Sequence, residues 1–319
     1  MSPLLALPVV DGVEITTIMD NSFDLLMAST AVAHRYPMRQ DVLTRPQLRA
    51  EHGVSTLITI INSGRRETIL FDTGVSPDGA LHNIDVLGIH LDEIQAIVLS
   101  HGHIDHTRGM DGLLDRLGKR RMPILLHPDA FLKRRLVIHD DKVVDLPPPS
   151  LRDLEREGIE LLVERGPSFL VNGTVLVTGQ VERSTDFETG MKNQQAEIDG
   201  EWLPDPWVYD DQAIIINVRN KGLVVITGCG HAGVVNILRH ASAQTGVEQI
   251  YAVIGGFHLS GAAFEPIIPQ TIAALQQLNP AVVVPAHCTG WRAAHGIARA
   301  MPEAFIPNSV GTTYLLMSE

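Results

Sequence analysis

The sequence predicts an α/β protein in which two sheets pack face to face between outer helices, a four-layer αββα sandwich. Strand patterns come first, at Ser55–Asn62 and Glu67–Asp72, and strands alternating with helices follow them. A second group repeats this order, beginning with the hairpin of Ala213–Arg219 and Leu223–Thr227. Two successive groups of strands and β–α units are typical of two packed sheets that are covered by helices on their outer faces.

Apolar periodicity and breaker residues place the remaining elements. In the first half, helices are expected over 77–88, 108–117 and 151–157, and strands over 94–99, 123–126, 159–163, 168–171 and 174–178. In the second half, helices are expected over 234–243, 267–278 and 292–300, and strands over 250–254, 281–285 and 312–317. The first long strand pattern begins at Ser55, and no strand is predicted before it.

The chain is expected to form one domain over residues 1–319, interrupted by two insertions. Residues 130–150 carry a Lys-Arg-Arg run and three successive prolines, which favour a surface insertion. Residues 184–211 are polar and mixed, and they are long enough to cover a site as a lid. Trp202 and Trp207 lie within this second insertion, where they are candidates for stacking on a flat ring.

The bulk composition excludes several classes of protein. The formal net charge is −12, and such a surface repels phosphate backbones, so no nucleic-acid partner is expected. No apolar run approaches the roughly 20 residues of a membrane span. The N-terminus lacks a basic region and a clear cleavage site, so a cytoplasmic protein without a membrane partner is expected. A small, even anionic, substrate remains compatible because a bound metal dominates its local field. A homo-oligomer is left open.

The residues that carry chemistry follow a predicted buried strand. Ser100-His101-Gly102-His103-Ile104-Asp105-His106 places three imidazoles and one carboxylate within six residues. These are the ligands that zinc and similar divalent ions prefer. A tight loop points His101 and His103 at one ion and Asp105 and His106 at a second. One or two divalent ions are therefore expected, with zinc first and manganese, nickel or iron as alternatives.

Four motifs in order resemble the metallo-β-lactamase superfamily. They are Phe71-Asp72-Thr73-Gly74, the loop from His101 to His106, Thr227-Gly228-Cys229 and Pro285-Ala286-His287. The resemblance implies the αββα fold, an Asp72 that supports the metal loop from behind, and a His287 that completes the second metal site.

Two positions depart from this family pattern. The motif that normally supplies a third histidine to the first metal ends here in Gln180, and the bridging aspartate is replaced by Cys229. A thiolate binds or bridges zinc, because the metal forces its deprotonation. His231, two residues further on, is the other candidate for the missing imidazole. The metal ligands implied by the resemblance and these departures are His101, His103, Asp105, His106, Cys229, His231 and His287.

Three further segments resemble one subgroup of the superfamily. They are Thr227–Gly233, Gly255–Leu259 and Pro285–Gly290, and the subgroup holds dihydropterin–ribofuranosylaminobenzene phosphate synthases and relatives called metal-dependent hydrolases. His258, within the second segment, is expected to orient the metal ligands or contact substrate. Cys288 is expected to be structural, and a Cys229–Cys288 disulfide is disfavoured in a reducing compartment.

The expected function is a metal-dependent hydrolase that uses a metal-activated hydroxide on a small ester, phosphoester or lactone. In it, Asp105 ligates a metal and moves a proton late in turnover, and His258 supports the reaction. One alternative is a synthase of pterin cofactor biosynthesis, which needs a pocket for a flat heterocycle and two phosphates. An alternative of another class is a non-hydrolytic metal-binding or redox module.

Overall fold

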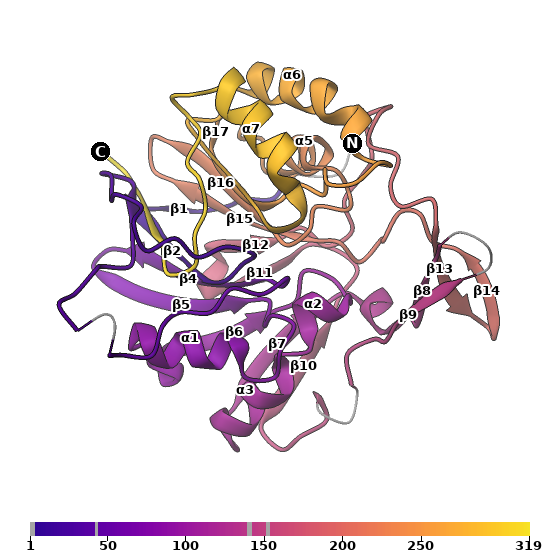
Figure 1. The fold of residues 1–319 in the computed structure, drawn as a ribbon, viewed down its shortest axis with the longest axis horizontal. Coiled ribbons are helices and arrows are strands. Elements are labelled where there is room, and N and C mark those ends of the chain that lie inside the picture. Colours follow the sequence, from indigo (N-terminus) through magenta and orange to yellow (C-terminus); the bar gives the residue numbers. More distant parts are fainter. Residues whose placement is uncertain (1–3, 42–43, 139–141, 151–153) are drawn as a thin grey trace.

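Two large sheets lie face to face, and helices cover the outer face of each (Figure 1). The computed structural model describes residues 4–41, 44–138, 142–150 and 154–319. From one side to the other, the layers are helices, sheet, sheet and helices. The predicted α/β class and four-layer αββα architecture are therefore confirmed.

The first sheet joins both ends of the chain. Its strand order is β10-β7-β6-β5-β4-β2-β19-β3. The bounds are β2 Gly12–Met19, β3 Ala33–His34, β4 Ser55–Asn62, β5 Arg65–Phe71, β6 Ile94–Val98, β7 Met122–Leu126, β10 Ile159–Val163 and β19 Thr313–Met317. The prediction that strands begin at Ser55 is wrong, because β2 pairs with β4 and β19 inside this sheet. Glu and Thr interrupt its apolar residues, so β2 lacks the apolar run that marks its neighbours.

The second sheet has the order β11-β12-β15-β16-β17-β18, with β1 beside β15. Its strands are β1 Val9–Val10, β11 Ser168–Leu170, β12 Val175–Val177, β15 Ala213–Val218, β16 Gly222–Thr227, β17 Ile250–Gly256 and β18 Val282–Ala286. Strands β16, β17 and β18 run parallel, so the segments that follow them emerge at one edge. The same holds in the first sheet for β5, β6 and β7.

Helices cover the two outer faces. On the first sheet lie α1 Gly79–Leu87, the short α2 Ile104–Thr107 and α3 Met110–Leu117. On the second lie α5 Val234–Thr245, α6 Ile268–Leu278 and α7 Gly290–Ala300, at the top of Figure 1. Each described helix is too short or too polar to cross a bilayer. The expected helix over 151–157 falls partly outside the described residues.

Three apolar layers bind the four structural layers together. The central layer fills the space between the sheets, where Ile58 and Phe71 of one meet Ile214 and Val224 of the other. A second layer packs α5, α6 and α7 on the second sheet, and a third packs α1 and α3 on the first. Burial of these side chains is the main favourable term of folding, at about 25 cal/mol per Å² of apolar surface. The sheets therefore form a rigid frame for the loops at their edges.

The two predicted insertions meet in a small third sheet, the flap, which projects from the sandwich (Figure 1). Its strands are β8 Arg134–Val137, β9 Val143–Leu146, β13 Gln194–Ile198 and β14 Glu201–Pro204, in the order β14-β13-β8-β9. Strand β8 of the first insertion pairs antiparallel with β13 of the second. The two segments are thus one structural unit, although the sequence presents them as separate insertions.

Candidate metal centre

The predicted metal-binding motifs meet at one edge of the sandwich. The loop that begins at Ser100 follows β6, Cys229 and His231 follow β16, His258 follows β17, and His287 follows β18. Because parallel strands end at the same edge, four segments distant in sequence converge there. The tertiary structure thus brings together side chains that the sequence predicts only as separate motifs.

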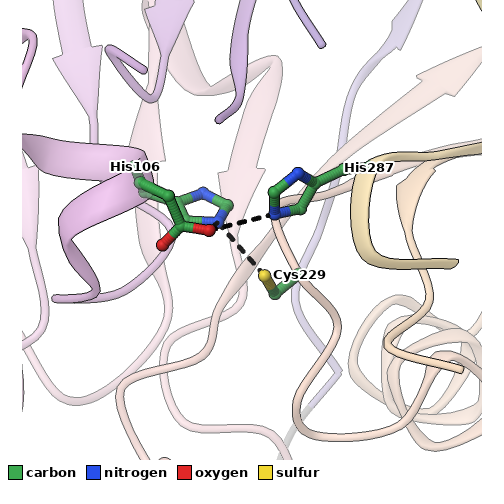
Figure 2. A group of neighbouring side chains, drawn as sticks. His106, Cys229 and His287 are labelled. Atoms are coloured by element: carbon green, nitrogen blue, oxygen red, sulfur yellow. Dashed lines mark hydrogen bonds and ion pairs between the residues drawn. The ribbon is translucent and has the colours of Figure 1, made fainter. Parts of the chain in front are cut away.

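Four of these side chains form what we call the carboxylate–thiol set: Asp105, His106, Cys229 and His287. Their candidate ligand atoms all lie within 4.8 Å of one another. His106 Nε2 is 3.1 Å from Cys229 Sγ, and His287 Nε2 is 3.2 Å from Asp105 Oδ2. Figure 2 shows His106, Cys229 and His287 turned toward one another. One carboxylate, one thiol and two imidazoles offer a four-coordinate ligand set for a borderline divalent ion.

Buried groups behind the carboxylate–thiol set orient its imidazoles. Asp72 Oδ2 lies 2.6 Å from His106 Nδ1, and its carboxylate also accepts hydrogen bonds from Ser100 N and Oγ. Asn21 Oδ1 lies 3.2 Å from His287 Nδ1, and Asn21 Nδ2 donates to the His287 carbonyl. In both rings Nδ1 faces an acceptor, so Nε2 is directed at the set. The predicted supporting role of Asp72 agrees with this geometry.

The backbone at this edge allows the close packing. Asp72 has φ 60° and His287 has φ 48°, both in the left-handed region that residues other than glycine rarely adopt. Gly228 sits against the same cluster, where an added Cβ would lie 2.1 Å from Ser100 Oγ and 2.9 Å from Asp72 Oδ2. Glycine is therefore required at 228 for the loop after β16 to approach the metal loop.

His101, His103 and His231 form the second ligand group, which we call the imidazole set. His101 Nε2 is 3.2 Å from His231 Nε2, and the ring of His103 packs 4.6 Å from His101 and 4.8 Å from His231 between centroids. The candidate ligand atoms of His101, His231 and Cys229 also lie within 4.8 Å of one another. Cys229 therefore borders both sets, in the place where the family resemblance implies a bridging ligand.

Cys229, His231 and Gln180 were the candidates to complete the first metal site, and the structure brings only Cys229 and His231 close to His101. Gln180 is exposed, and its backbone N–H bonds to the Arg165 carbonyl. His231 is buried and faces His101. The geometry thus selects His231, which the sequence offered only as an alternative.

Burial keeps the imidazole set uncharged. Burial, and after it the charge of the nearby Arg134, lowers the pKa of His103 to about 4. The pKa values of His101 and His231 are also well below the ordinary value, because of burial and then the neighbouring histidines. Neutral imidazoles present lone pairs, which is the state a metal requires.

The carboxylate–thiol set has the opposite electrostatic character. Burial alone would lower the pKa of His106, but the carboxylates of Asp105 and Asp72 together raise it to about 9. Burial opposes ionisation of Asp105, yet His106 and His287 hold its pKa well below the ordinary range. Burial raises the pKa of the Cys229 thiol, so its thiolate needs a cation beside it. This set therefore exchanges protons when it binds a metal.

His258 lies beside the imidazole set. Its ring centroid is 4.2 Å from that of His231 and 4.5 Å from that of Phe264. Its candidate ligand atom also groups with Cys229 and Cys288. Both cysteines are free thiols, and the Cys288 thiol donates to the Cys229 carbonyl at 3.2 Å. His258 therefore lies against the ring of His231 in the imidazole set. Cys288 packs against the backbone of the loop that carries Cys229.

Several site residues were missed by the sequence analysis. His52 packs 4.7 Å from the His287 ring and exposes 69% of its side chain, which puts it at the solvent side of the centre. Asp20 and Asn21 follow the missed strand β2 and bond to His287. Gln194, in the flap, bonds to His103. None of these residues belongs to a recognisable motif. The one available signal was strand β2, which was not predicted and which brings residues before Ser55 to the site.

The donor set fits a divalent cation. Within the described part of the chain, His231 Nδ1 and His258 Nδ1 are buried polar atoms without a hydrogen-bond partner, and His287 Nε2 faces only the carboxylate of Asp105. Such orphaned atoms are uncommon in buried sites unless a ligand or ion satisfies them. Imidazole, thiol and carboxylate together match the preferences of zinc and neighbouring transition metals.

Residues 49–240 match the family model of the metallo-beta-lactamase superfamily, and the chain belongs to this superfamily. A 7,8-dihydropterin-6-methyl-4-(beta-D-ribofuranosyl)-aminobenzene-5'-phosphate synthase of Methanocaldococcus jannaschii is 30% identical over 266 residues, covering 80% of this chain and 87% of the relative. An uncharacterized protein of the same organism is 30% identical over 251 residues, covering 76% of this chain and 86% of that one.

Solved structures share the fold. A crystal structure of a metal-dependent hydrolase of the beta-lactamase superfamily has a TM-score of 0.71 and 24% identity, over 96% of this chain and 100% of the other. The metallo-beta-lactamase fold protein YhfI from Bacillus subtilis has a TM-score of 0.50 and 12% identity, over the same shares of the two chains. Together with the synthase relative, membership of this superfamily supports a metal-dependent enzyme.

Proposed function

We propose that the protein is a metal-dependent hydrolase that cleaves a small ester, phosphoester or lactone. The observation that carries this proposal is that Cys229 belongs to two groups of candidate ligand atoms, one with Asp105, His106 and His287 and one with His101 and His231, and that the atoms of each group lie within 4.8 Å of one another. Ligand sets that share a bridging group suit two ions about 3.5–4 Å apart, a spacing at which both hold one oxygen-rich substrate. We further propose that the ion is zinc, because imidazole, thiolate and carboxylate are the donors that zinc prefers.

Bound divalent ions would supply an activated water and polarise the substrate oxygen. In this proposal His101, His103 and His231 would hold one ion and Asp105, His106 and His287 would hold the other, and Cys229 is within reach of both sets. Asp105 would also carry a proton late in turnover, and its Oδ2 lies 3.9 Å from His52 Nε2, a separation that one water molecule would bridge. Because His52 is largely exposed, it connects this proton to solvent.

A second candidate is a synthase that joins a pterin derivative to a ribosylated aminobenzene phosphate. The relative of that name, 30% identical over 80% of this chain, favours it. A pocket beside His231 and His258 is lined by Phe187, Phe257 and Phe264, which supports contact with an aromatic group. The expected stacking residue Trp202 lies instead in the flap, with its ring 4.2 Å from the Arg135 guanidinium.

Metal analysis combined with turnover tests this proposal. The purified protein is assayed for bound metal and for hydrolysis of bis-p-nitrophenyl phosphate and an ester and lactone panel. The pterin and aminobenzene substrate pair is assayed in parallel. His103→Ala and Cys229→Ser are expected to lose metal and activity. His82→Ala serves as the matched control, because His82 is remote and bonds through Nε2 to the Gln47 carbonyl.

The outcomes separate the candidates. Hydrolysis that disappears in both site variants supports the hydrolase. Condensation of the pterin pair without hydrolysis supports the synthase. Bound iron with no turnover on any substrate would support a non-hydrolytic redox module. Wild-type protein that binds no divalent metal would contradict all three.

A further inference from the structure

The flap contacts the imidazole set through one side chain. Gln194 of β13 is fully buried, and its Oε1 lies 3.0 Å from His103 Nε2. Its amide nitrogen lies 3.2 Å from Asp205 Oδ2 and 3.4 Å from the Asp205 carbonyl. The Gln194 amide is thus wedged between a candidate metal ligand and an acidic residue at the end of the flap.

Asp205 determines which way the Gln194 amide points. An ionised carboxylate and a backbone carbonyl are both acceptors only, so the NH₂ of Gln194 must face them. The reverse orientation would direct an amide oxygen at the Asp205 carboxylate. Arg134 holds that carboxylate in place, since its Nε donates to Asp205 Oδ2 at 2.8 Å. Gln194 Oε1 is therefore left facing His103.

The amide orientation in turn determines the tautomer of His103. An amide oxygen accepts but does not donate, so a bond to it requires the proton on His103 Nε2. In a neutral ring, Nδ1 then carries the lone pair. A metal ligand whose other ring nitrogen is held by an acceptor is the usual arrangement of metal-binding histidines.

The same ion network anchors the metal loop. Arg134 also pairs with Asp210, with Nη2 2.5 Å from Oδ1. Asp210 Oδ2 accepts from Gly102 N at 2.8 Å, between His101 and His103. Arg134 exposes only 2% of its surface and Asp210 none. One buried arginine of β8 thus connects Gln194, through Asp205, with the backbone of the metal loop, through Asp210.

We propose that Gln194 is a positioning residue that fixes His103 in its Nε2–H tautomer, so that Nδ1 binds the ion of the imidazole set. The flap is then a part of the metal centre and not only a cover over it. The part of this inference that concerns metal binding rests on the proposed function. The tautomer of His103 does not, because it is a property of the metal-free protein.

Two measurements test the assignment. The first is the tautomer of His103 in the metal-free protein, read from ¹⁵N–¹H long-range correlations of the imidazole and assigned by their loss in His103→Asn. The second is metal affinity, by competition with a chromophoric chelator. Gln194→Leu removes the acceptor, and Gln194→Met is a second variant of similar length. Gln195→Leu is the matched control, since Gln195 is its strand neighbour and bonds to Arg135 on the opposite face.

Wild type and Gln195→Leu are expected to show the Nε2–H tautomer, and the Gln194 variants a mixture. Metal affinity should fall about 10–100-fold in the Gln194 variants, the usual cost of removing such a partner. An Nδ1–H tautomer in wild type, or unchanged affinity and tautomer in both Gln194 variants, overturns the proposal. If wild type binds no metal, the proposed function fails while the tautomer still decides the role of Gln194.

Discussion

The two ligand sets of the candidate metal centre differ in charge, and different parts of the molecule orient their side chains. In the carboxylate–thiol set Asp105 is ionised and the pKa of His106 is raised. Asp72 and Asn21, which belong to the sandwich, orient the rings of His106 and His287 in this set. The imidazole set is uncharged, and the flap residue Gln194 supports it. The first set is thus ordered by the rigid sheets, whereas the second depends on a projecting unit that packs through a buried ion network.

Because of this difference, the two sets are expected to bind a cation in different ways. A set with its own anion attracts a cation strongly but must release protons to bind it. A set of neutral rings binds a cation without proton release, and its geometry has to be supplied by neighbours. Variants that alter charge should therefore act on the first set, and variants that loosen the flap should act on the second.

The largest effect is expected from Asp105→Asn. This variant removes the anion of the carboxylate–thiol set and the proposed proton carrier, so turnover should fall about 10²–10⁴-fold. The pKa of His106 should also fall, because Asp105 is the largest of the influences that raise it. Steady-state kinetics and metal content measure these effects. Asp85→Asn is the control, since Asp85 pairs with Arg116 on the exposed helical layer, and equal losses in both variants would contradict the assignment.

An intermediate effect is expected when the ion network of the flap is broken. Arg134→Met leaves Asp205 and Asp210 without their buried cation, which typically costs about 3–5 kcal/mol of unfolding free energy. Arg135→Met, at the next position of the same strand, loses a partly exposed contact with Trp202 and a hydrogen bond to Gln195, and should cost about 1–2 kcal/mol. Denaturant unfolding measures both. Similar losses would show that the flap does not depend on the buried network.

The smallest effect is a difference in proton release. At pH 7 His106, with its pKa raised to about 9, is protonated, so metal binding must expel a proton and affinity should rise with pH up to about 9. His103, with its pKa lowered to about 4, is already neutral and releases none. Calorimetry in buffers of different ionisation enthalpy counts the protons. Wild type should release more protons than Asp105→Asn, in which His106 loses the largest influence that raises its pKa, and the reverse order would refute the comparison.

The sign of the accompanying stability effect follows from the same values. In the metal-free protein the pKa of His106 is raised above its unfolded value of about 6.5. Its stabilising contribution is therefore complete below that pH and is lost as pH rises through about 9. Unfolding free energies of the metal-free protein at pH 6 and pH 9.5, compared with those of His106→Asn, measure this contribution.

Most strands and helices were predictable because their apolar periodicity matches their burial. Strands β16 and β18 are nearly continuous runs of buried aliphatic residues, which mark a sheet enclosed on both faces, and β4 and β6 are also mostly buried and rich in β-branched residues. The flap was not predictable, since β8 and β13 are short and mixed, and their pairing spans about sixty residues of sequence. Its stability comes from long-range contacts, which leave no local pattern.

The candidate site divides in the same way. The histidines and the aspartate of the loop that begins at Ser100 were evident from their spacing, and Cys229, His231 and His287 from the resemblance of their strand-end motifs to the superfamily. Gln194, Asn21 and His52 belong to segments without a motif, and each becomes part of the site only through the fold. Choosing His231 over Gln180 likewise required knowing which side chain is buried against His101.

By itself, the sequence determined the layered architecture and the chemical identity of the candidate metal ligands, because periodicity and residue type are local properties. The tertiary structure decided how those ligands divide into an anionic and a neutral set. It also decided which nitrogen of each ring is held by a partner. Those choices depend on hydrogen bonds between residues far apart in the chain, whose positions are determined by the packing of the sheets and the flap.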